Sequence, residues 1–236
     1  MDREALTHLR SLVYRGDAAG LVAALSKEWW PASLQLIGDG LRAAVAGAVD
    51  GSTDLALTCV EALRERRWEG DRELAESIEA ALGNGPTPML RPLPVDLEEL
   101  AMILEGDPVH GGGRIDLVTG EVWPQSALEY AEEIGEIAEE GDDDPDRWLW
   151  VDCEGSRSGY HDMVWFIDDL DDPGLADRLS RAISGRGAFR RFKAVLSDRL
   201  DLMAEWHVLS NERQRGRARA WLVAEGYTPT LPSPGR

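Results

Sequence analysis

Apolar residues recur at helical spacing through the first part of the chain, as far as Gly83. Leu6, Leu9 and Leu12 fall on one side of a helix, and four further segments carry similar apolar stripes. Short turns containing Gly, Asp or Ser separate the stripes, but no repeat period is clear enough to indicate a named solenoid. We therefore expect residues 1–82 to form an all-helical module of stacked helical hairpins.

The stretch 83–96 breaks this helical pattern. It contains four prolines among fourteen residues, and a proline inside a helix removes a backbone hydrogen bond and clashes with the preceding turn. We therefore expect an extended Pro/Gly-rich linker over these residues, and we place the boundary between two modules there.

After the linker, the apolar spacing changes from helical to alternating. Asp96 is a suitable N-cap for a short helix. Residues 113–124 then alternate apolar and polar positions on both sides of Gly120, which is typical of a β-hairpin. Residues 147–154 are a candidate third strand. Together these segments predict a small antiparallel sheet, with an acidic helix and an acidic loop between the second and third strands.

Amphipathic helical segments fill the remainder of the chain as far as Tyr227. Pro173 directly behind Asp172 is a typical helix start. We expect residues 97–227 to form an α+β module and residues 228–236 to be a frayed tail. The fold class predicted for the whole chain is therefore α+β and predominantly α-helical.

Charge is distributed unevenly along the chain, whose formal net charge is −19. Residues 101–185 contain 22 acidic and 5 basic side chains, whereas residues 186–236 contain 5 acidic and 10 basic ones. This polarity has two interpretations. Either the acidic middle packs against the basic end and neutralises it, or the basic end leaves a cationic face open to a ligand.

Cysteine and histidine spacing gives no sign of a metal site. Cys59 and Cys153 are far apart, and the four histidines lack the spacing of zinc ligands. The acidic string at 141–148 lacks the turn glycine and the closing glutamate of a calcium loop. We therefore expect no metal, no cofactor and a reduced, cytoplasmic protein. The absence of a signal sequence or a long apolar run predicts that no membrane is a partner.

Acidic residues also gather at 162–172, where an acid/base enzyme could use a pair of carboxylates. No two of them are marked by the separated environments that such chemistry needs, and carboxylates near helix ends are expected on electrostatic grounds alone. The sequence therefore favours a protein without a catalytic site, although it leaves an enzyme open.

The stretch 185–196, GRGAFRRFKAVL, is the main candidate for a ligand site. At 100° per residue, Phe189, Phe192 and Leu196 fall on one apolar arc, so the basic side chains face the other way. Free N–H groups at a helix N-terminus beside several cations can hold a phosphate or a carboxylate. The candidate anion-binding residues are Gly185, Arg186, Gly187, Arg190, Arg191 and Lys193.

A purely structural interpretation of the same stretch stays open. Basic residues commonly form the solvated side of an amphipathic helix, Gly185 can end the preceding helix, and Gly187 can permit a tight turn. Four arginines at 213–219 pose a similar question. They flank an apolar seam, so we expect their stems to cover it and their charged heads to remain in water. In the ligand interpretation, Arg213 and Arg217 assist the candidate site.

The C-terminal half of the chain resembles a known bacterial family. Five segments between about Val95 and Tyr227 carry the resemblance in the expected order: VDLEEL, IDLVTGEV, SGYHDMVWFI, AISGRGAFRRFK and AWLVAEG. They are similar to uncharacterised protein family 0158, whereas residues 1–82 lie outside the match. The entry to the first strand, HGGGR, departs from the aromatic-rich entry of related sequences. The resemblance implies a fold and a boundary, and it implies no activity.

Two functions from different classes follow from these patterns. The leading one is a non-enzymatic, cytoplasmic protein-interaction or regulatory module with a protein partner, because packed helical hairpins present grooves. The alternative is a protein that binds a phosphate-bearing ligand or nucleic acid through the basic helix at 186–193. The overall negative charge repels nucleic acid over most of the surface, so any such contact must be local.

Overall fold

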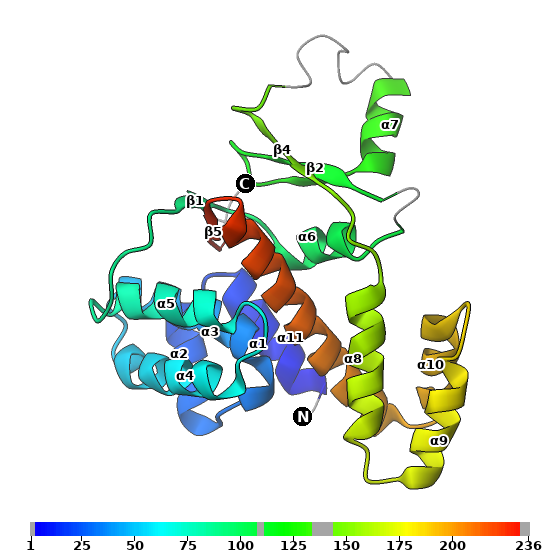
Figure 1. Ribbon diagram of the computed structural model, residues 1–236. Coiled ribbons are helices and arrows are strands. Elements are labelled where there is room, and N and C mark those ends of the chain that lie inside the picture. The colour runs from blue at the N-terminus through cyan, green and yellow to red at the C-terminus, as the bar shows by residue number, and fades with distance from the viewer. Residues whose placement is uncertain (1–2, 108–110, 134–143, 232–236) are drawn as a thin grey trace.

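The structure is a computed structural model that describes residues 3–107, 111–133 and 144–231. Within these residues, helices dominate and short strands form two small sheets. The predicted α+β class with mainly helical content is confirmed (Figure 1). Most of the predicted acidic loop, residues 134–143, lies outside the described residues.

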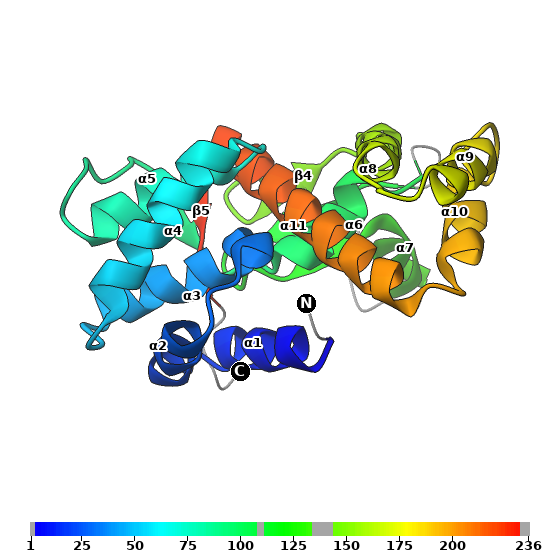
Figure 2. The same cartoon turned by 90° about the horizontal axis from the view of Figure 1, so that it is seen from below.

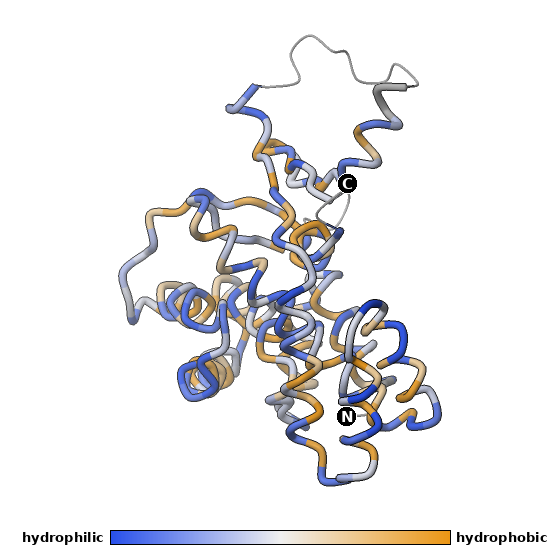
Figure 3. Tube along the Cα trace, turned by 45° about the vertical axis from the view of Figure 1, so that its right-hand side comes forward, coloured by the Kyte–Doolittle hydropathy of each residue, from blue (hydrophilic) through white to orange (hydrophobic). Residues whose placement is uncertain are grey.

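The first part of the chain is helical, as its apolar stripes predict. Its elements are α1 (Arg3–Tyr14), α2 (Ala18–Lys27), a short 3-10 helix η1 (Pro31–Ser33), α3 (Leu34–Ala46), α4 (Ser52–Arg66) and α5 (Asp71–Ala81). Leu9, Ile37 and Leu63 are among the residues that pack into their common core. Hydrophobic and hydrophilic residues alternate along these helices at helical spacing, which places one side of each helix in that core (Figure 3).

The predicted hairpin and third strand form one antiparallel sheet. Its strands are β2 (Gly113–Asp116), β3 (Val122–Pro124) and β4 (Trp148–Val151), in the order β3-β2-β4. Ile115 pairs with Val122 on one side and with Leu149 on the other. The central strand therefore has both of its edges hydrogen-bonded, and the predicted small sheet is confirmed.

A second, two-stranded sheet joins the two stretches that we expect to be a linker and a frayed tail. Strand β1 (Arg91–Leu93) pairs in parallel with β5 (Tyr227–Pro229). The Arg42 guanidinium also donates a hydrogen bond of 2.7 Å to the Pro229 carbonyl. Residues 91–93 of the expected extended linker are thus a paired strand, and residues 228 and 229 of the expected frayed tail are held in the same sheet. Strands of three residues are too short to show a period, and their partners are distant in sequence. The division of the chain into modules stays a prediction.

Six further helices complete the described part of the chain: α6 (Leu97–Leu104), α7 (Gln125–Glu133), α8 (Arg157–Asp168), α9 (Pro173–Ala182), α10 (Ala188–Leu196) and α11 (Leu200–Ala224). The Asp96 carboxylate caps α6 by accepting a hydrogen bond of 2.7 Å from the Glu98 N–H. Asp172 caps α9 in the same way, at 2.9 Å from the Leu175 nitrogen. Both predicted helix starts are confirmed.

Helix α11 runs through the middle of the molecule, where it contacts η1, α3, α5, α6, α8, α10 and β5 (Figures 1 and 2). Near its start, Trp206 packs on Phe192 with ring centroids 4.7 Å apart, in a core shared with α8, α9 and α10. Near its end, Ala218 and Leu222 pack into a core with α6, β2 and β4. Between these points, a charged face of α11 meets the N-terminal helices.

This charged face contradicts the expectation that the arginine heads of α11 remain in water. The side chains of Arg215 and Arg219 are only 4% and 2% exposed. Arg219 donates to both oxygens of Asp39 on α3 at 2.9 Å. Arg215 lies 3.3 Å from Asp39 and 2.9 Å from Glu98 on α6. The sequence does not reveal these burials, because each carboxylate comes from a different, distant helix.

Glu212, one turn earlier on α11, caps the N-terminus of α3. Its carboxylate accepts hydrogen bonds from the backbone nitrogens of Gln35 and Leu36, at 2.8 Å and 3.2 Å. The Arg66 guanidinium, 3.0 Å away, joins this carboxylate to that of Asp71. Burial raises the pKa of Glu212, while Arg66 and the two backbone donors act in the opposite direction. A side chain far away in sequence thus satisfies helix donors that Ser33 does not.

The backbones of the two parts also approach closely at two glycines. Gly70, in the turn between α4 and α5, lies against Gly216 of α11, and a Cβ atom on either residue would clash with backbone atoms of the other segment. Gly70 has a φ of +81°, a conformation that suits glycine. The N-terminal helices are therefore seated on α11 by backbone contact as well as by ion pairs.

We expect the change Gly216→Ala to destabilise the protein by about 2 kcal/mol or more, because the added methyl group collides with the Glu69 carbonyl oxygen. Urea denaturation measures the difference. The matched control is Gly174→Ala in α9, where a Cβ atom has room, and there the change is expected to be neutral or slightly stabilising. Equal stability of the two variants would contradict the close packing at Gly216.

The buried pair of Asp39 and Arg219 should also give a pH-dependent contribution to stability. Burial raises the pKa of the Asp39 carboxyl, but Arg219 and Arg215 outweigh burial and hold the pKa below its usual value. The stabilisation is therefore present above the unfolded pKa of about 3.9 and is lost as the pH falls through the lower folded pKa.

For the isosteric variant Asp39→Asn, we expect a loss of about 3 kcal/mol at pH 7, because two guanidinium groups lose their buried partner. The difference between the free energies of unfolding of the two proteins, measured in urea from pH 7 down to pH 3, should begin to shrink below about pH 4. A difference that stays constant over this range would show that the carboxylate charge is not what stabilises this contact.

Candidate functional site

The basic stretch predicted as an anion site forms the turn between α9 and α10 and the first turns of α10. Gly185 and Gly187 have φ angles of +80° and +76°, and Gly187 occupies the N-cap position of α10. Both glycines thus adopt the left-handed conformation that such a turn needs. Phe192 and Leu196 are fully buried, which places the basic side chains on the outer side of the helix.

Arg191 does not face outward. Its guanidinium folds back over the end of α9, where it donates hydrogen bonds of 2.7 Å to the Ala182 and Ser184 carbonyls and further bonds to those of Gly185 and Arg186. These carbonyls end a helix and lack partners within it. Arg191 therefore stabilises the turn between the helices, and its donors are occupied.

Arg186, Arg190 and Lys193 behave differently from Arg191. All three are exposed, and no ion pair holds them within the described part of the chain. Arg213 and Arg217 do not join them. Arg217 donates to Asp162 and to Glu105, at 2.8 Å and 2.7 Å, and Arg213 also pairs with Asp162. The structure thus keeps three of the predicted cations available and assigns the others to internal contacts.

Lys193 lines a hollow that we call the α10–α11 groove. Its volume is about 890 Å³, and α1, α8, α10 and α11 contribute its walls. Apolar side chains line much of it: Leu6, Phe189, Leu200, Met203, Ala204, Trp206 and Val208. Leu200 is 79% exposed, which is unusual for a large apolar side chain.

The polar side chains of the groove are mostly cationic or neutral. Lys193 and His207 are exposed at its edge, while Arg10 pairs with Glu98. The acidic member, Asp201, is paired with Arg199 at 2.9 Å. The groove therefore combines an apolar surface with Lys193, a cation that forms no ion pair among the described residues, in a protein whose net charge is −19.

The acidic middle of the chain neutralises part of the basic end. Asp162 and Glu105 pair with arginines of α11, as the first interpretation of the charge polarity expects. The described part of the predicted acidic helix, α7, and helix α10 lie apart from one another in Figure 1.

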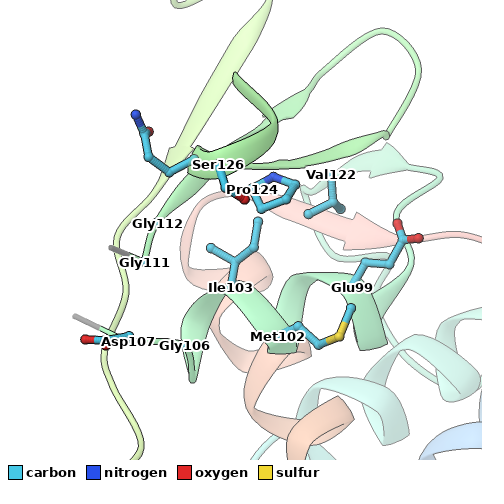
Figure 4. Close-up of a pocket in the computed structure, with 11 residues that line it drawn as sticks. Glu99, Met102, Ile103, Gly106, Asp107, Gly111, Gly112, Val122, Pro124 and Ser126 are labelled. Atoms are coloured by element: carbon cyan, nitrogen blue, oxygen red, sulfur yellow. The ribbon is translucent and has the colours of Figure 1, made fainter. Parts of the chain in front are cut away.

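A second hollow, of about 460 Å³, lies between α6 and strand β3 (Figure 4). Met102 and Ile103 of α6 face Val122 and Pro124 across it, with Glu99 at one end. Sequence reasoning missed this site, because its walls come from a helix and a hairpin that each show only an ordinary apolar pattern. The exposed fraction of Met102, 70%, is the feature that singles it out.

Metal and membrane features are absent from the described residues. No group of three or more His, Cys, Asp or Glu side chains there could hold a metal ion. Across the same residues, no helix has both the length and the apolar character needed to cross a bilayer. Cys59 is buried in the N-terminal core, where burial raises the pKa of its thiol.

Comparison with known proteins confirms the family resemblance. The model of the uncharacterised protein family UPF0158 matches residues 90–232. A UPF0158 protein of Pseudomonas aeruginosa is 28% identical over 155 residues, which cover 62% of this chain and 98% of the relative. That relative therefore has no counterpart of the N-terminal helices. No solved structure is similar to the chain at a significant level.

The role of Arg191 as a cap of α9 can be separated from that of its exposed neighbour. We expect Arg191→Ala to destabilise the protein by about 1 kcal/mol, because several carbonyls lose a charged donor. Arg190→Ala should change stability by less than about 0.5 kcal/mol. Thermal denaturation of the two variants, one position apart, checks the assignment. A larger loss for Arg190→Ala would reverse it.

Proposed function

The chain belongs to the uncharacterised protein family UPF0158, and from that premise we propose that it is a non-enzymatic interaction protein. Its partner is a segment of another protein that carries both apolar and acidic side chains, and the binding site is the α10–α11 groove. The observation that carries this proposal is the combination of an apolar surface and the exposed cation of Lys193 in one open groove.

The shape of the groove suits an amphipathic helix. Helices α1, α10 and α11 provide walls, and Phe189, Leu200 and Met203 offer apolar and aromatic contact area between them. Partners of this kind insert an apolar stripe into such a groove and keep their polar side in water. Aromatic side chains at the centre of an interface contribute much of its binding energy.

Charge decides which amphipathic helix is favoured. Lys193 lies at the rim, and Arg190 and Arg186 continue the cationic surface along α10 and the turn before it. Because most of the protein is acidic, this surface is a local exception that attracts an acidic partner and orients it. Loss of these charges should act mainly on the association rate and its salt dependence.

Two buried carboxyl groups with a shifted pKa have structural rather than catalytic explanations. The pKa of Asp39 is lowered and that of Glu212 is raised, and both groups are buried in ion pairs. Neither lines the α10–α11 groove. Their perturbation is therefore explained by structural contacts. A reduced, cytoplasmic setting is part of the proposal, since the two cysteines are free thiols.

The alternative function is binding of a phosphate-bearing ligand or nucleic acid by Arg186, Arg190 and Lys193. It is favoured by one observation, namely that these three cations are exposed without ion-pair partners among the described residues. Such binding uses the cations alone and does not need the apolar surface of the groove. It also weakens steeply with salt, because phosphate contacts release counterions.

A photo-crosslinking amino acid at Leu200, inside the groove, tests the proposal in cells of the native host. We expect a discrete protein adduct that disappears when Arg190→Glu and Lys193→Glu are added. The same crosslinker at Val118, an exposed position in the β2–β3 turn, is the matched control and should not give this adduct. Circular dichroism shows whether the charge-reversed protein is folded.

The outcomes separate the two functions. A protein adduct that depends on the α10 charges supports the groove proposal. A nuclease-sensitive adduct, with labelled RNA or DNA binding in fluorescence anisotropy that Arg190→Glu and Lys193→Glu abolish, supports the alternative. An adduct at Leu200 that also forms in the charge-reversed protein contradicts the acidic character of the partner. If no adduct forms at Leu200, the groove is not an interface.

A further inference from the structure

The hollow between α6 and β3 has properties that differ from those of the α10–α11 groove. It is smaller, at about 460 Å³, which falls in the range of sites for small molecules or single side chains. Its charged lining residues, Glu99 and Asp107, are both acidic. Figure 4 shows Ile103 rising from α6 toward Pro124, and Met102 extending along the helix toward Glu99, with Val122 above.

The apolar walls of the hollow suit an alkyl chain. Ile103 is buried and belongs to the core, whereas Met102, the residue before it on α6, is 70% exposed. Methionine is unbranched and flexible, so it can adjust to a chain inserted beside it. An alkyl chain that covers Met102 and Val122 removes apolar surface from water, and each buried methylene contributes about 0.8 kcal/mol.

Glycines form the wall opposite Glu99. Gly112 has a φ of +115°, a conformation that other residues rarely adopt. A Cβ atom at Gly111 would clash with the Asp107 carbonyl and lie 2.9 Å from the Cys153 sulfur. The φ angle of Gly112 and the close neighbours of Gly111 therefore favour glycine at both positions, so this wall of the hollow carries no side chains.

Acidic side chains make the electrostatic potential at the hollow negative. Burial raises the pKa of Glu99, and the negative charges of Asp96 and Glu121 raise it further. Among the described residues, the two charged groups that shift the pKa of Glu99 are carboxylates. A cation placed beside Glu99 relieves this repulsion, whereas an anion increases it.

We propose that this hollow binds a primary ammonium group carried on an alkyl chain, with the chain between Met102 and Val122 and the ammonium group at Glu99. Two sources supply this chemistry, a free polyamine and the lysine side chain of a partner polypeptide. The site is separate from the α10–α11 groove, and it does not depend on the function proposed for that groove.

The test is isothermal titration of the full chain with n-hexylammonium, n-butylammonium and hexanoate. We expect the hexyl cation to bind more tightly than the butyl cation, because it buries more methylene groups, and we expect hexanoate to bind at least about tenfold more weakly. The variant Glu99→Gln should weaken binding of the hexyl cation about threefold or more. Glu61→Gln, an exposed position on α4, is the control and should leave it unchanged.

A second variant keeps the result interpretable. Met102→Ala shortens the apolar wall, so it should reduce the difference between the hexyl and butyl cations and leave the preference over hexanoate. Spermidine and a lysine-containing tripeptide, titrated in parallel, distinguish the two sources by which binds more tightly. Equal binding of hexanoate and the hexyl cation, or wild-type affinity in Glu99→Gln, would overturn the proposal.

Discussion

The buried ion pairs on α11 are the contacts on which the arrangement of this protein depends. Arg219 with Asp39, and Arg66 with Glu212 and Asp71, connect α11 to helices far away in sequence. A buried ion pair adds little net stability over an apolar contact, because both charges lose their hydration. Removing one partner leaves an uncompensated buried charge, which is costly. The network therefore specifies one seating of the N-terminal helices and penalises every other.

Two glycines also help to set the position of the N-terminal helices on α11. At Gly70 and Gly216 the two parts meet backbone to backbone, so the ion pairs form at a distance that larger residues would prevent. Two side chains that form an ion pair between helices can span only a limited distance, so the backbones of the two helices must lie close together. The curated relative covers the C-terminal part of the chain and has no counterpart of the N-terminal helices. In this protein those helices cover one face of α11, and ligands must use other surfaces.

The two proposed sites follow from what α11 and its neighbours leave accessible. The start of α11 forms a groove with α1, α8 and α10, where apolar side chains meet Lys193. The hollow above α6 has the opposite charge, because its charged lining residues are Glu99 and Asp107, and the charges of Asp96 and Glu121 act on Glu99. A protein with a net charge of −19 can in this way offer one cationic and one anionic site, each selective for a different partner chemistry.

The sequence by itself determined the local elements, because these depend on residues close together in the chain. Helical periodicity, the Asp96 and Asp172 caps and the alternation around Gly120 predict elements that the structure confirms. The tertiary structure alone decided which charges meet. Arg213 to Arg219 have the same local pattern as solvated arginines, but Asp39, Glu98, Glu105 and Asp162 approach them from three other helices. Arg191 and Lys193 differ in the same way: one folds back on helix-end carbonyls, and the other lines an open groove. Spacing along a helix fixes the direction of a side chain, whereas its partner is fixed by contacts between distant segments.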